Sequence, residues 1–245
     1  MEDKISAGSY DLNKWLFGGY ERDIITTIYG PAGSGKTNMC MLAAVSQAKK
    51  SSKVIYIDSE GGFSLERFKQ IAGKENEKAV ENILLMNPMN FSEQKKIFDS
   101  LAEKINSNSK IGLIIVDSMA MLYRLEIAEA GKEDSEEKIR NINKELAKQL
   151  RILAEIARRK NIPVIVTNQV YYNFLTEEEF RSGAEKKANM VGGDLLKYWS
   201  KCLIEIEIKK GRRNMNLIKH RSLPEKEMPF IIVNEGIKKR GYFGI

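Results

Sequence analysis

Residues 30–37 are Gly30-Pro31-Ala32-Gly33-Ser34-Gly35-Lys36-Thr37, a complete phosphate-binding loop of the form G-x-x-x-x-G-K-[ST]. Its glycines let the backbone close into a nest of N–H groups that point at phosphate oxygens. We expect Lys36 to reach the β- and γ-phosphates and the Thr37 hydroxyl to bind Mg²⁺. The loop and the next residue, Asn38, are therefore predicted to hold the phosphates of a nucleotide.

The segments around the loop decide between a ligand site and an ordinary glycine-rich turn. The apolar run at 24–29 is typical of a buried strand, and residues 38–45 have the pattern of a helix. A helix that begins at the loop directs its positive N-terminus at a bound anion. This strand–loop–helix order predicts that a nucleoside triphosphate binds, and it disfavours a turn without ligand.

Length and composition limit the kind of protein. The chain has 245 residues, of which 42% are hydrophobic, and this size suits one α/β domain over residues 1–245. No stretch offers the roughly 20 uninterrupted apolar residues of a membrane span, and the N-terminus lacks the pattern of a signal peptide. Cys40 and Cys202 lie outside any C-x-x-C spacing, which favours core positions, and a single histidine, His220, excludes a histidine-rich metal site. We predict a cytoplasmic protein without a membrane anchor.

Charge is distributed unevenly along the chain. There are 40 Lys and Arg against 33 Asp and Glu, which gives a formal net charge of +7. The stretch 129–137 is acidic, whereas 209–221 and 238–240 are rich in Lys and Arg. A plain basic surface or an attraction to nucleic acid would both give this composition, and the asymmetry favours a directed basic patch.

Strand-like and helical patterns alternate through most of the sequence. This alternation predicts an α/β fold with a mainly parallel central sheet that is flanked by helices. After residue 200 the rhythm changes to short strands that alternate apolar and charged residues, as expected of antiparallel strands that extend the sheet. The expected strands are 53–58, 83–86, 111–117, 163–167, 203–208, 215–218 and 229–233, and the expected helices are 64–72, 92–105 and 136–160.

Three residues at strand ends are candidates for chemistry beside the phosphate loop. Asp117 ends the apolar run 111–117, the usual place for an acidic residue that holds Mg²⁺ directly or through water, although it could instead cap the next segment. Glu60 comes after the strand 53–58 and could polarise the attacking water as a general base, or it could be a solvated turn residue. Gln169 ends the strand after Asp117, where its neutral amide could sense the γ-phosphate or cap backbone groups.

The order of these motifs resembles that of RecA-type recombinase cores. Residues 56–61, 113–118 and 166–170 are similar to the family's ordered signatures. The start of the chain at 5–16 resembles the archaeal and eukaryotic branch, and the resemblance spans nearly the whole chain. It implies a RecA-like P-loop NTPase core that binds ATP and Mg²⁺.

The same resemblance implies roles for individual residues. Glu60 becomes the residue that activates water, Gln169 the sensor of the γ-phosphate, and Lys36 the third catalytic residue. Thr37 and Asp117 become the residues that hold the metal. The segment 219–224 is similar to one that approaches the nucleotide of a neighbouring subunit in recombinase filaments, but a structural hairpin would suit it equally.

In length the chain resembles a short archaeal paralogue of the RadA recombinase. It begins at the ATPase core, without the N-terminal helix-hairpin-helix domain and the Phe-x-x-Ala polymerisation hook of the full recombinase. The resemblance implies an accessory protein of homologous recombination and DNA repair that binds ATP and DNA, with weak ATPase activity and no autonomous strand exchange. The RadA recombinase and a Holliday junction resolvase are the protein partners that it implies, and it leaves a homo-oligomer open.

Two loops face DNA in this family, after the strands of Asp117 and Gln169. The first, at 123–134, is largely acidic here despite Arg124 and Lys132, which is a poor composition for binding phosphates. The second, at 171–190, interleaves aromatic and basic residues in a way that suits single-stranded DNA, although core or partner contacts would also explain the aromatics. Its candidate DNA contacts are Tyr171, Tyr172, Arg181, Lys186 and Lys187.

A third candidate is the predicted hairpin tip after the strand 203–208. Four of five consecutive positions there are basic, and we expect them to add to DNA binding. These four residues are Lys209, Lys210, Arg212 and Arg213.

Two functions of other classes suit part of the pattern. A signalling or clock-type ATPase on the same fold would act on a protein partner, and a phosphate loop by itself permits a small-molecule kinase. The Asn168-Gln169 pair and the lack of an evident lid segment weigh against the kinase. DNA binding that falls with salt would separate the recombination protein from the signalling ATPase.

Overall fold

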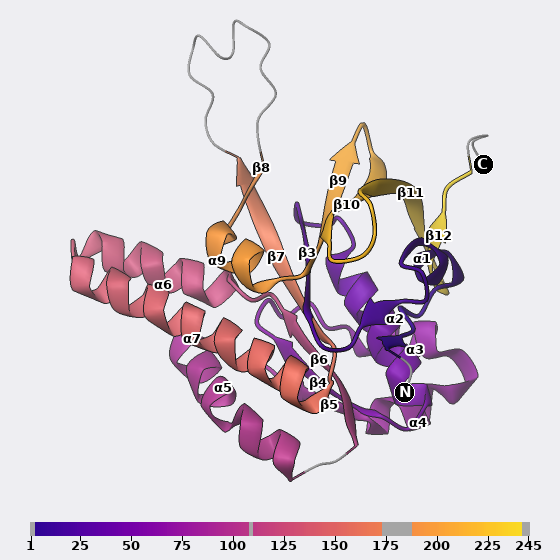
Figure 1. Cartoon of the computed structure of the whole chain (residues 1–245), viewed down its shortest axis with the longest axis horizontal. Coiled ribbons are helices and arrows are strands. Elements are labelled where there is room, and N and C mark those ends of the chain that lie inside the picture. The colour runs from indigo at the N-terminus through magenta and orange to yellow at the C-terminus, as the bar shows by residue number, and fades with distance from the viewer. Residues whose placement is uncertain (1–2, 108–109, 173–187, 242–245) are drawn as a thin grey trace, which may run out of the picture.

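The computed structural model describes residues 3–107, 110–172 and 188–241. Figure 1 shows a twisted sheet through the middle of the molecule, with helices packed on both of its sides. The elements are β1 (Lys4–Ile5), α1 (Tyr10–Trp15), β2 (Tyr20–Glu21), β3 (Ile25–Gly30), α2 (Lys36–Lys49), β4 (Lys53–Asp58), α3 (Leu65–Ala72), η1 (Gly73–Glu75), α4 (Asn76–Glu81), β5 (Ile83–Met86), α5 (Phe91–Asn106), β6 (Ile111–Asp117), α6 (Met121–Lys132), α7 (Glu136–Lys160), β7 (Val164–Tyr172), β8 (Ala188–Met190), α9 (Gly193–Trp199), β9 (Cys202–Lys209), β10 (Arg212–His220), β11 (Lys226–Val233) and β12 (Gly236–Lys239).

The main sheet has a parallel part and an antiparallel part. Its strands lie in the order β12-β11-β10-β9-β3-β7-β6-β4-β5, and β8 pairs with the end of β7. Every pairing from β9 to β5 is parallel, whereas β9, β10, β11 and β12 pair antiparallel to one another. The predicted fold, a mainly parallel sheet extended by antiparallel C-terminal strands, is confirmed.

The parallel strands are mainly apolar because both faces of the sheet are covered. Along β6, Leu113 and Ile115 join the core on the side of α2, while Ile114 and Val116 join the core on the side of α5 and α7. Successive side chains of a strand point to opposite faces, so a strand between two helical layers needs apolar residues at every position.

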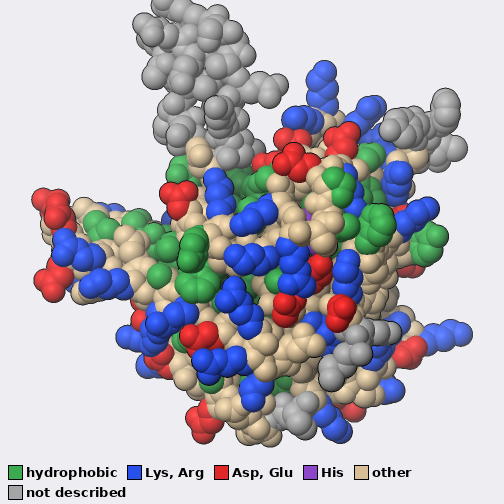
Figure 2. All heavy atoms as spheres, viewed as in Figure 1, with side chains coloured by type: hydrophobic (Ala, Val, Ile, Leu, Met, Phe, Trp, Pro, Cys, Tyr) green, Lys and Arg blue, Asp and Glu red, His purple; other side chains and the backbone are tan. Residues whose placement is uncertain are grey.

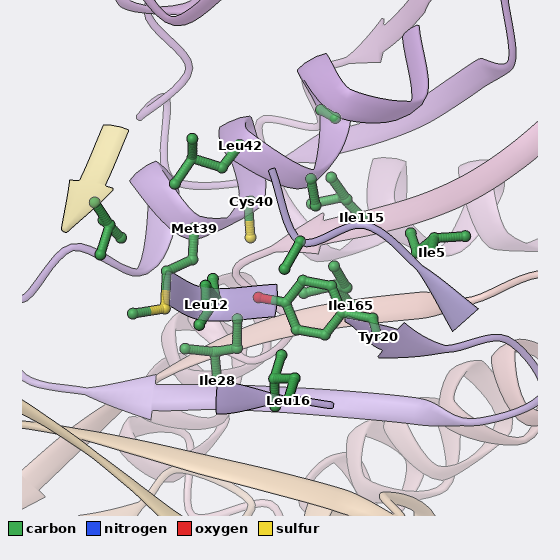
Figure 3. Close-up of a cluster of buried hydrophobic side chains, with 14 of the residues drawn as sticks. Ile5, Leu12, Leu16, Tyr20, Ile28, Met39, Cys40, Leu42, Ile115 and Ile165 are labelled. Atoms are coloured by element: carbon green, nitrogen blue, oxygen red, sulfur yellow. The ribbon is translucent and has the colours of Figure 1, made fainter. Parts of the chain in front are cut away.

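The N-terminal segment completes the core on the side of α2. Figure 3 shows Leu12 of α1, Leu16 directly after that helix and Tyr20 of β2 gathered with Ile28 of β3 and Met39 of α2. All five side chains are buried.

The two cysteines lie in the core as predicted. Cys40 on α2 and Cys202 on β9 are buried and free. Burial raises the pKa of the Cys202 thiol to about 12, so this sulfur stays protonated at neutral pH. Within the described residues, no helix is both long and apolar enough to cross a membrane.

One edge of the sheet collects the ends of several strands that the sequence marks as functional. β7 and β9 both run parallel to β3, so their carboxyl ends lie at the edge where β3 enters the phosphate loop. Figure 1 accordingly shows β7 and the β9–β10 hairpin projecting toward the same end of the molecule.

Candidate functional site

The phosphate loop joins β3 to α2 in the predicted order. It leaves the strand at Gly30 and enters the helix at Lys36. Gly33 and Gly35 have φ angles of 69° and 111°, which residues with a Cβ rarely adopt. A Cβ on Gly35 would also lie 3.0 Å from Cδ1 of Ile232 on β11. The loop therefore needs glycine for its backbone conformation and, at position 35, for its packing against β11.

A pocket of about 180 Å³ opens beside this loop. Besides the loop it is lined by Glu60 after β4, Gln169 of β7 and Ile232 of β11. The fold thus brings the phosphate loop together with Glu60 and Gln169, which are 109 positions apart in the sequence. The loop residues that line the pocket are Ala32, Gly33, Ser34, Gly35, Lys36, Thr37 and Asn38.

The Lys36 side chain is folded onto its own loop. Its ammonium donates to the carbonyl oxygens of Gly30 at 3.0 Å and Pro31 at 2.9 Å, and the residue is only 6% exposed. Burial lowers the pKa of Lys36, while the carboxylates of Glu60 and Asp117 oppose that shift. Two nearby carboxylates therefore favour the charged ammonium in a buried position.

Hydrogen-bond donors of the loop remain available for an anion. The Ser34 hydroxyl is buried and has no hydrogen-bond partner among the described residues. The first turn of α2 begins at Gly35 without a side-chain cap, so its N–H groups are not used by a capping residue. A phosphate group fits this donor set, because it would accept from both the hydroxyl and the helix N-terminus.

Glu60 and Gln169 meet directly in the pocket. The amide Nε2 of Gln169 donates to Oε1 of Glu60 at 3.1 Å. The register of β3 and β7 sets Gln169 opposite Gly30, where the phosphate loop begins. The predicted sensor amide and the predicted base are therefore hydrogen-bonded neighbours. The strand itself continues beyond Gln169 to Tyr172, so the prediction that it ends at Gln169 was wrong.

Asp58 builds the turn that presents Glu60. Its carboxylate accepts from the backbone N–H groups of Glu60 at 3.3 Å, Gly62 at 3.1 Å and Phe63 at 2.9 Å. Gly62 lies against Thr37, since a Cβ there would be 3.5 Å from the Thr37 hydroxyl. The turn is thus anchored at one end by Asp58 and rests on the phosphate loop at the other.

Asp117 ends β6 and is 1% exposed. Its Oδ2 accepts from the Tyr56 hydroxyl at 2.9 Å, and its Oδ1 accepts from the Thr167 hydroxyl at 2.5 Å. Burial, reinforced by this carboxylate, raises the pKa of Tyr56 well above its ordinary value, so Tyr56 remains a donor. Hydroxyls on the two neighbouring strands therefore fix the orientation of Asp117.

Asp58, Tyr56 and Thr167 are site residues that the sequence patterns did not single out. Asp58 had a signal, because an Asp at a strand end before glycines is typical of a turn that bonds its own backbone. Tyr56 and Thr167 each follow a run of apolar residues within their strands, and only the pairing of β4, β6 and β7 shows that both face Asp117. Among the described residues, no group of three or more His, Cys, Asp or Glu side chains could hold a metal ion by itself.

The first loop expected to face DNA is mostly a helix. Residues 123–134 fall largely within α6, and this part of the prediction was wrong. The helix forms because Leu122 and Ala130 are buried in a small cluster with Phe91 of α5 and Ile142 of α7. Apolar spacing toward a partner helix thus forms a helix where the family resemblance implies a loop.

The second DNA candidate is described only in part. Tyr171 lies near the end of β7 with 44% of its surface exposed, and Tyr172 is the last residue of that strand. The predicted contacts Arg181, Lys186 and Lys187 lie outside the described residues.

The third candidate forms the hairpin tip that the sequence predicts. Lys210 and Gly211 make the turn with φ angles of 50° and 73°, and Lys209 pairs with Arg212 across it. Figure 2 shows Lys and Arg side chains at the projecting end of this hairpin. Arg213 differs from the others, because its Nη2 donates to the carbonyl oxygen of Gly33 in the phosphate loop at 3.2 Å.

The segment 219–224 is tied to β2 and to the residues between β2 and β3. The Arg221 guanidinium forms two hydrogen bonds to Asp23, at 2.8 and 2.6 Å, and an ion pair with Glu21 at 2.6 Å. Its charge is therefore paired within the chain.

His220 organises the turn between β10 and β11. Its Nδ1 accepts from the N–H groups of Ser222 and Leu223, both at 3.1 Å, and its side chain is 2% exposed. Burial lowers the pKa of His220, with Lys4, Arg221 and Lys226 adding to the shift and Glu21 opposing it.

Comparison with known proteins gives a family for this arrangement. Residues 3–240 match the model of the Rad51 family. Proteins described as DNA repair and recombination protein RadB are similar to this chain in three archaea. In Methanocaldococcus jannaschii the identity is 41%, covering 93% of this chain and 98% of the relative. In Methanobrevibacter smithii it is 38%, covering 92% of each chain, and in Methanococcoides burtonii it is 37%, covering 97% and 99%.

A solved structure agrees with these relatives. The crystal structure of the RadB recombinase is 33% identical to this chain, covers 95% of it and 98% of its own length, and superimposes with a TM-score of 0.73. The resemblance to short archaeal paralogues of the RadA recombinase is thus confirmed.

Replacing Asp58 by Asn should destabilise the protein and loosen the turn at 60–63. An Asn amide group would face backbone N–H donors that the carboxylate now accepts from, so we expect the free energy of unfolding to fall by about 1–3 kcal/mol. Chemical denaturation measures this loss. Asp99→Asn is the control, since Asp99 makes an exposed ion pair with Lys148 and should change stability by less than about 1 kcal/mol. Equal losses in the two variants would contradict the anchoring role of Asp58.

The lone histidine should titrate below its ordinary pKa of 6.5. The unfolded chain then binds more protons than the folded chain below that pH, so the stability contributed by neutral His220 is lost as the pH falls below about 6.5. Because there is only one histidine, its imidazole resonance in an NMR titration reports the pKa without assignment. The acid loss of stability should shrink in His220→Gln, and a measured pKa at or above 6.5 would refute the buried neutral state.

Proposed function

This chain belongs to the Rad51 family, and from that membership we propose that it is an ATP-binding and DNA-binding accessory protein of homologous recombination and DNA repair, with slow ATP hydrolysis. One observation carries the proposal: the phosphate loop, Glu60 and Gln169 line a single pocket at the carboxyl edge of the sheet. In open α/β sheets, ligands bind in such a crevice outside the strand ends.

The loop residues would bind the triphosphate of ATP. Backbone N–H groups of the loop, the first turn of α2 and the Ser34 hydroxyl would donate to phosphate oxygens. Lys36 would exchange the carbonyls of Gly30 and Pro31 for phosphate oxygens, to which its ammonium binds more strongly because they are charged.

Thr37 and Asp117 would hold Mg²⁺, which neutralises phosphate charge when bound. Thr37 lines the pocket, whereas both carboxylate oxygens of Asp117 already accept hydrogen bonds from Tyr56 and Thr167. Asp117 would hold the ion through water or through a lone pair that these two hydrogen bonds leave available. Mg²⁺ usually keeps several of its waters and needs few protein ligands.

Glu60 would act as the general base of hydrolysis. Its Oε1 accepts from Gln169, which leaves the second carboxylate oxygen to take a proton from an attacking water. Gln169 cannot itself accept that proton at neutral pH, so its amide would hold Glu60 in place and respond to the γ-phosphate. Since Gln169 is three residues from the end of β7, a shift of its side chain would be passed to the exposed Tyr171.

DNA would bind along the edge where β7 and the β9–β10 hairpin project. The hairpin supplies cations for phosphates, and Tyr171 supplies an aromatic face for a base. The acidic helix α6 after Asp117 offers little positive charge at the corresponding place in the fold, which supports an accessory role over autonomous strand exchange.

Lys36→Ala should weaken ATP binding at least about tenfold, because it removes the buried cation that charge-assisted hydrogen bonds to phosphate require. Glu60→Gln should keep ATP binding and lower turnover by a factor of about 100 or more, as expected for loss of a general base. Isothermal titration and a phosphate-release assay measure the two effects. Glu66→Gln, an exposed residue in the first turn of α3, is the control and should leave both unchanged. Unchanged turnover in Glu60→Gln would remove Glu60 from the role of base.

Alanine at Lys209, Lys210 and Arg212 together should weaken binding of single-stranded DNA and lower its salt dependence. Each phosphate contact contributes about −0.7 to the slope of log affinity against log salt concentration, so three lost contacts should lower the slope by about 2. Fluorescence anisotropy across a salt series gives both quantities. The control is alanine at Lys69, Lys74 and Lys78, which are exposed on the distant α3–α4 region. Absence of salt-sensitive binding by the unmodified protein would favour a protein-directed ATPase instead.

A further inference from the structure

Arg213 links the β9–β10 hairpin to the phosphate loop. It is the second residue of β10, beside the basic turn, and its guanidinium reaches the phosphate loop, where Nη2 donates to the Gly33 carbonyl at 3.2 Å. This is a contact between residues 180 positions apart in the sequence. It joins the hairpin proposed to bind DNA to the loop proposed to bind ATP.

Sheet geometry directs Arg213 toward the loop and Arg212 away from it. In the antiparallel pairing of β10 and β11, Arg213 lies opposite Phe230, so these two side chains share a face of the sheet. Ile232, two residues along β11, shares that face and lines the pocket. Phe230 and Ile232 both approach Gly35 of the loop. Arg212 belongs to the opposite face and is exposed.

The contact also sets the direction of a loop amide. In a trans peptide the carbonyl and the N–H point in opposite directions, so a Gly33 carbonyl held toward Arg213 turns the N–H of Ser34 to the other side. That N–H donates to the Pro31 carbonyl at 3.3 Å, the same oxygen that accepts from Lys36. Arg213 thus contacts the same stretch of the loop, residues 31–34, whose Pro31 carbonyl accepts a hydrogen bond from the Lys36 ammonium.

The guanidinium has donor capacity left. Its Nε is buried and makes no hydrogen bond within the part of the chain that the structure describes. An arginine held by one weak contact, with a second donor unpaired, can rearrange when an anion arrives nearby.

We propose that Arg213 is a positioning residue that couples the phosphate loop to the basic hairpin, so that bound nucleotide raises the affinity for single-stranded DNA. The inference rests on the proposed ATP and DNA binding. The Arg213–Gly33 contact joins the loop to the hairpin, so a nucleotide that orders the loop would also order the hairpin to which DNA would bind. By linkage, DNA must raise the affinity for nucleotide by the same factor.

The test measures the Kd of a fluorescent oligo-dT with and without a non-hydrolysable ATP analogue and Mg²⁺, for the full chain and two variants. We expect the analogue to tighten binding at least about fivefold in the unmodified protein, a typical coupling factor. Arg213→Ala should bring this ratio close to one. Arg212→Ala, the matched control on the opposite face, should weaken DNA binding in both states and keep the ratio. Equal ratios in the two variants, or a ratio of one in the unmodified protein, would overturn the proposal.

Amide hydrogen exchange separates this inference from the proposed function. Arg213→Ala should speed exchange at residues 33–35 of the ligand-free protein, whereas Arg212→Ala should not. This readout needs neither ATP nor DNA, and thermal melts of both variants check that they fold. If the unmodified protein bound no DNA, the proposed function would fail while the exchange still reported on the contact. Unchanged exchange in Arg213→Ala would show that the contact does not hold the loop.

Discussion

The register between β3 and β7 governs the candidate site. Six consecutive residue pairs, from Ile25–Val164 to Gly30–Gln169, join the two strands in parallel. A slip of one residue would turn every side chain of β7 to the other face of the sheet. Gln169 would then point away from Glu60, and Thr167 away from Asp117. The chemistry of the pocket therefore depends on the backbone hydrogen bonds that fix the register of β7, the strand that carries Gln169, against β3.

Two buried carboxylates set the positions of the polar groups at this edge. Asp58 and Asp117 are 3% and 1% exposed, and an unpaired charge at such depth would be strongly unfavourable. Each is satisfied by donors from its own surroundings, Asp58 by the amides of its turn and Asp117 by hydroxyls on flanking strands. The ends of β4 and β6 are further joined by Ser59, whose hydroxyl donates to the Ser118 carbonyl at 2.5 Å. The pocket thus has rigid walls of strand and turn.

Periodic patterns in the sequence predict most of the fold. The strands 53–58, 83–86 and 111–117 and the helix 136–160 have the predicted bounds, because continuous apolar runs and helical spacing report burial directly. The helix α6 was missed because the family resemblance implies a loop there, although the segment carries a short apolar stripe. For the site, the phosphate loop was evident from its glycines, but the contact of Glu60 with Gln169 and that of Arg213 with Gly33 depend on strand order. No local pattern encodes which distant strands become neighbours.

The placement of β9 beside β3 also constrains the order of folding. The strand that feeds the phosphate loop is flanked on one side by β7 and on the other by β9, and a 2.6 Å hydrogen bond between Thr27 and Ser200 spans 173 positions. During synthesis, β3 emerges before β7 and β9, so both of its edges stay unpaired until these later strands have left the ribosome. Such distant pairings make folding slow and leave apolar strands exposed in the meantime. The phosphate loop is translated before Glu60 and Gln169, yet the sheet that holds it is completed only after both.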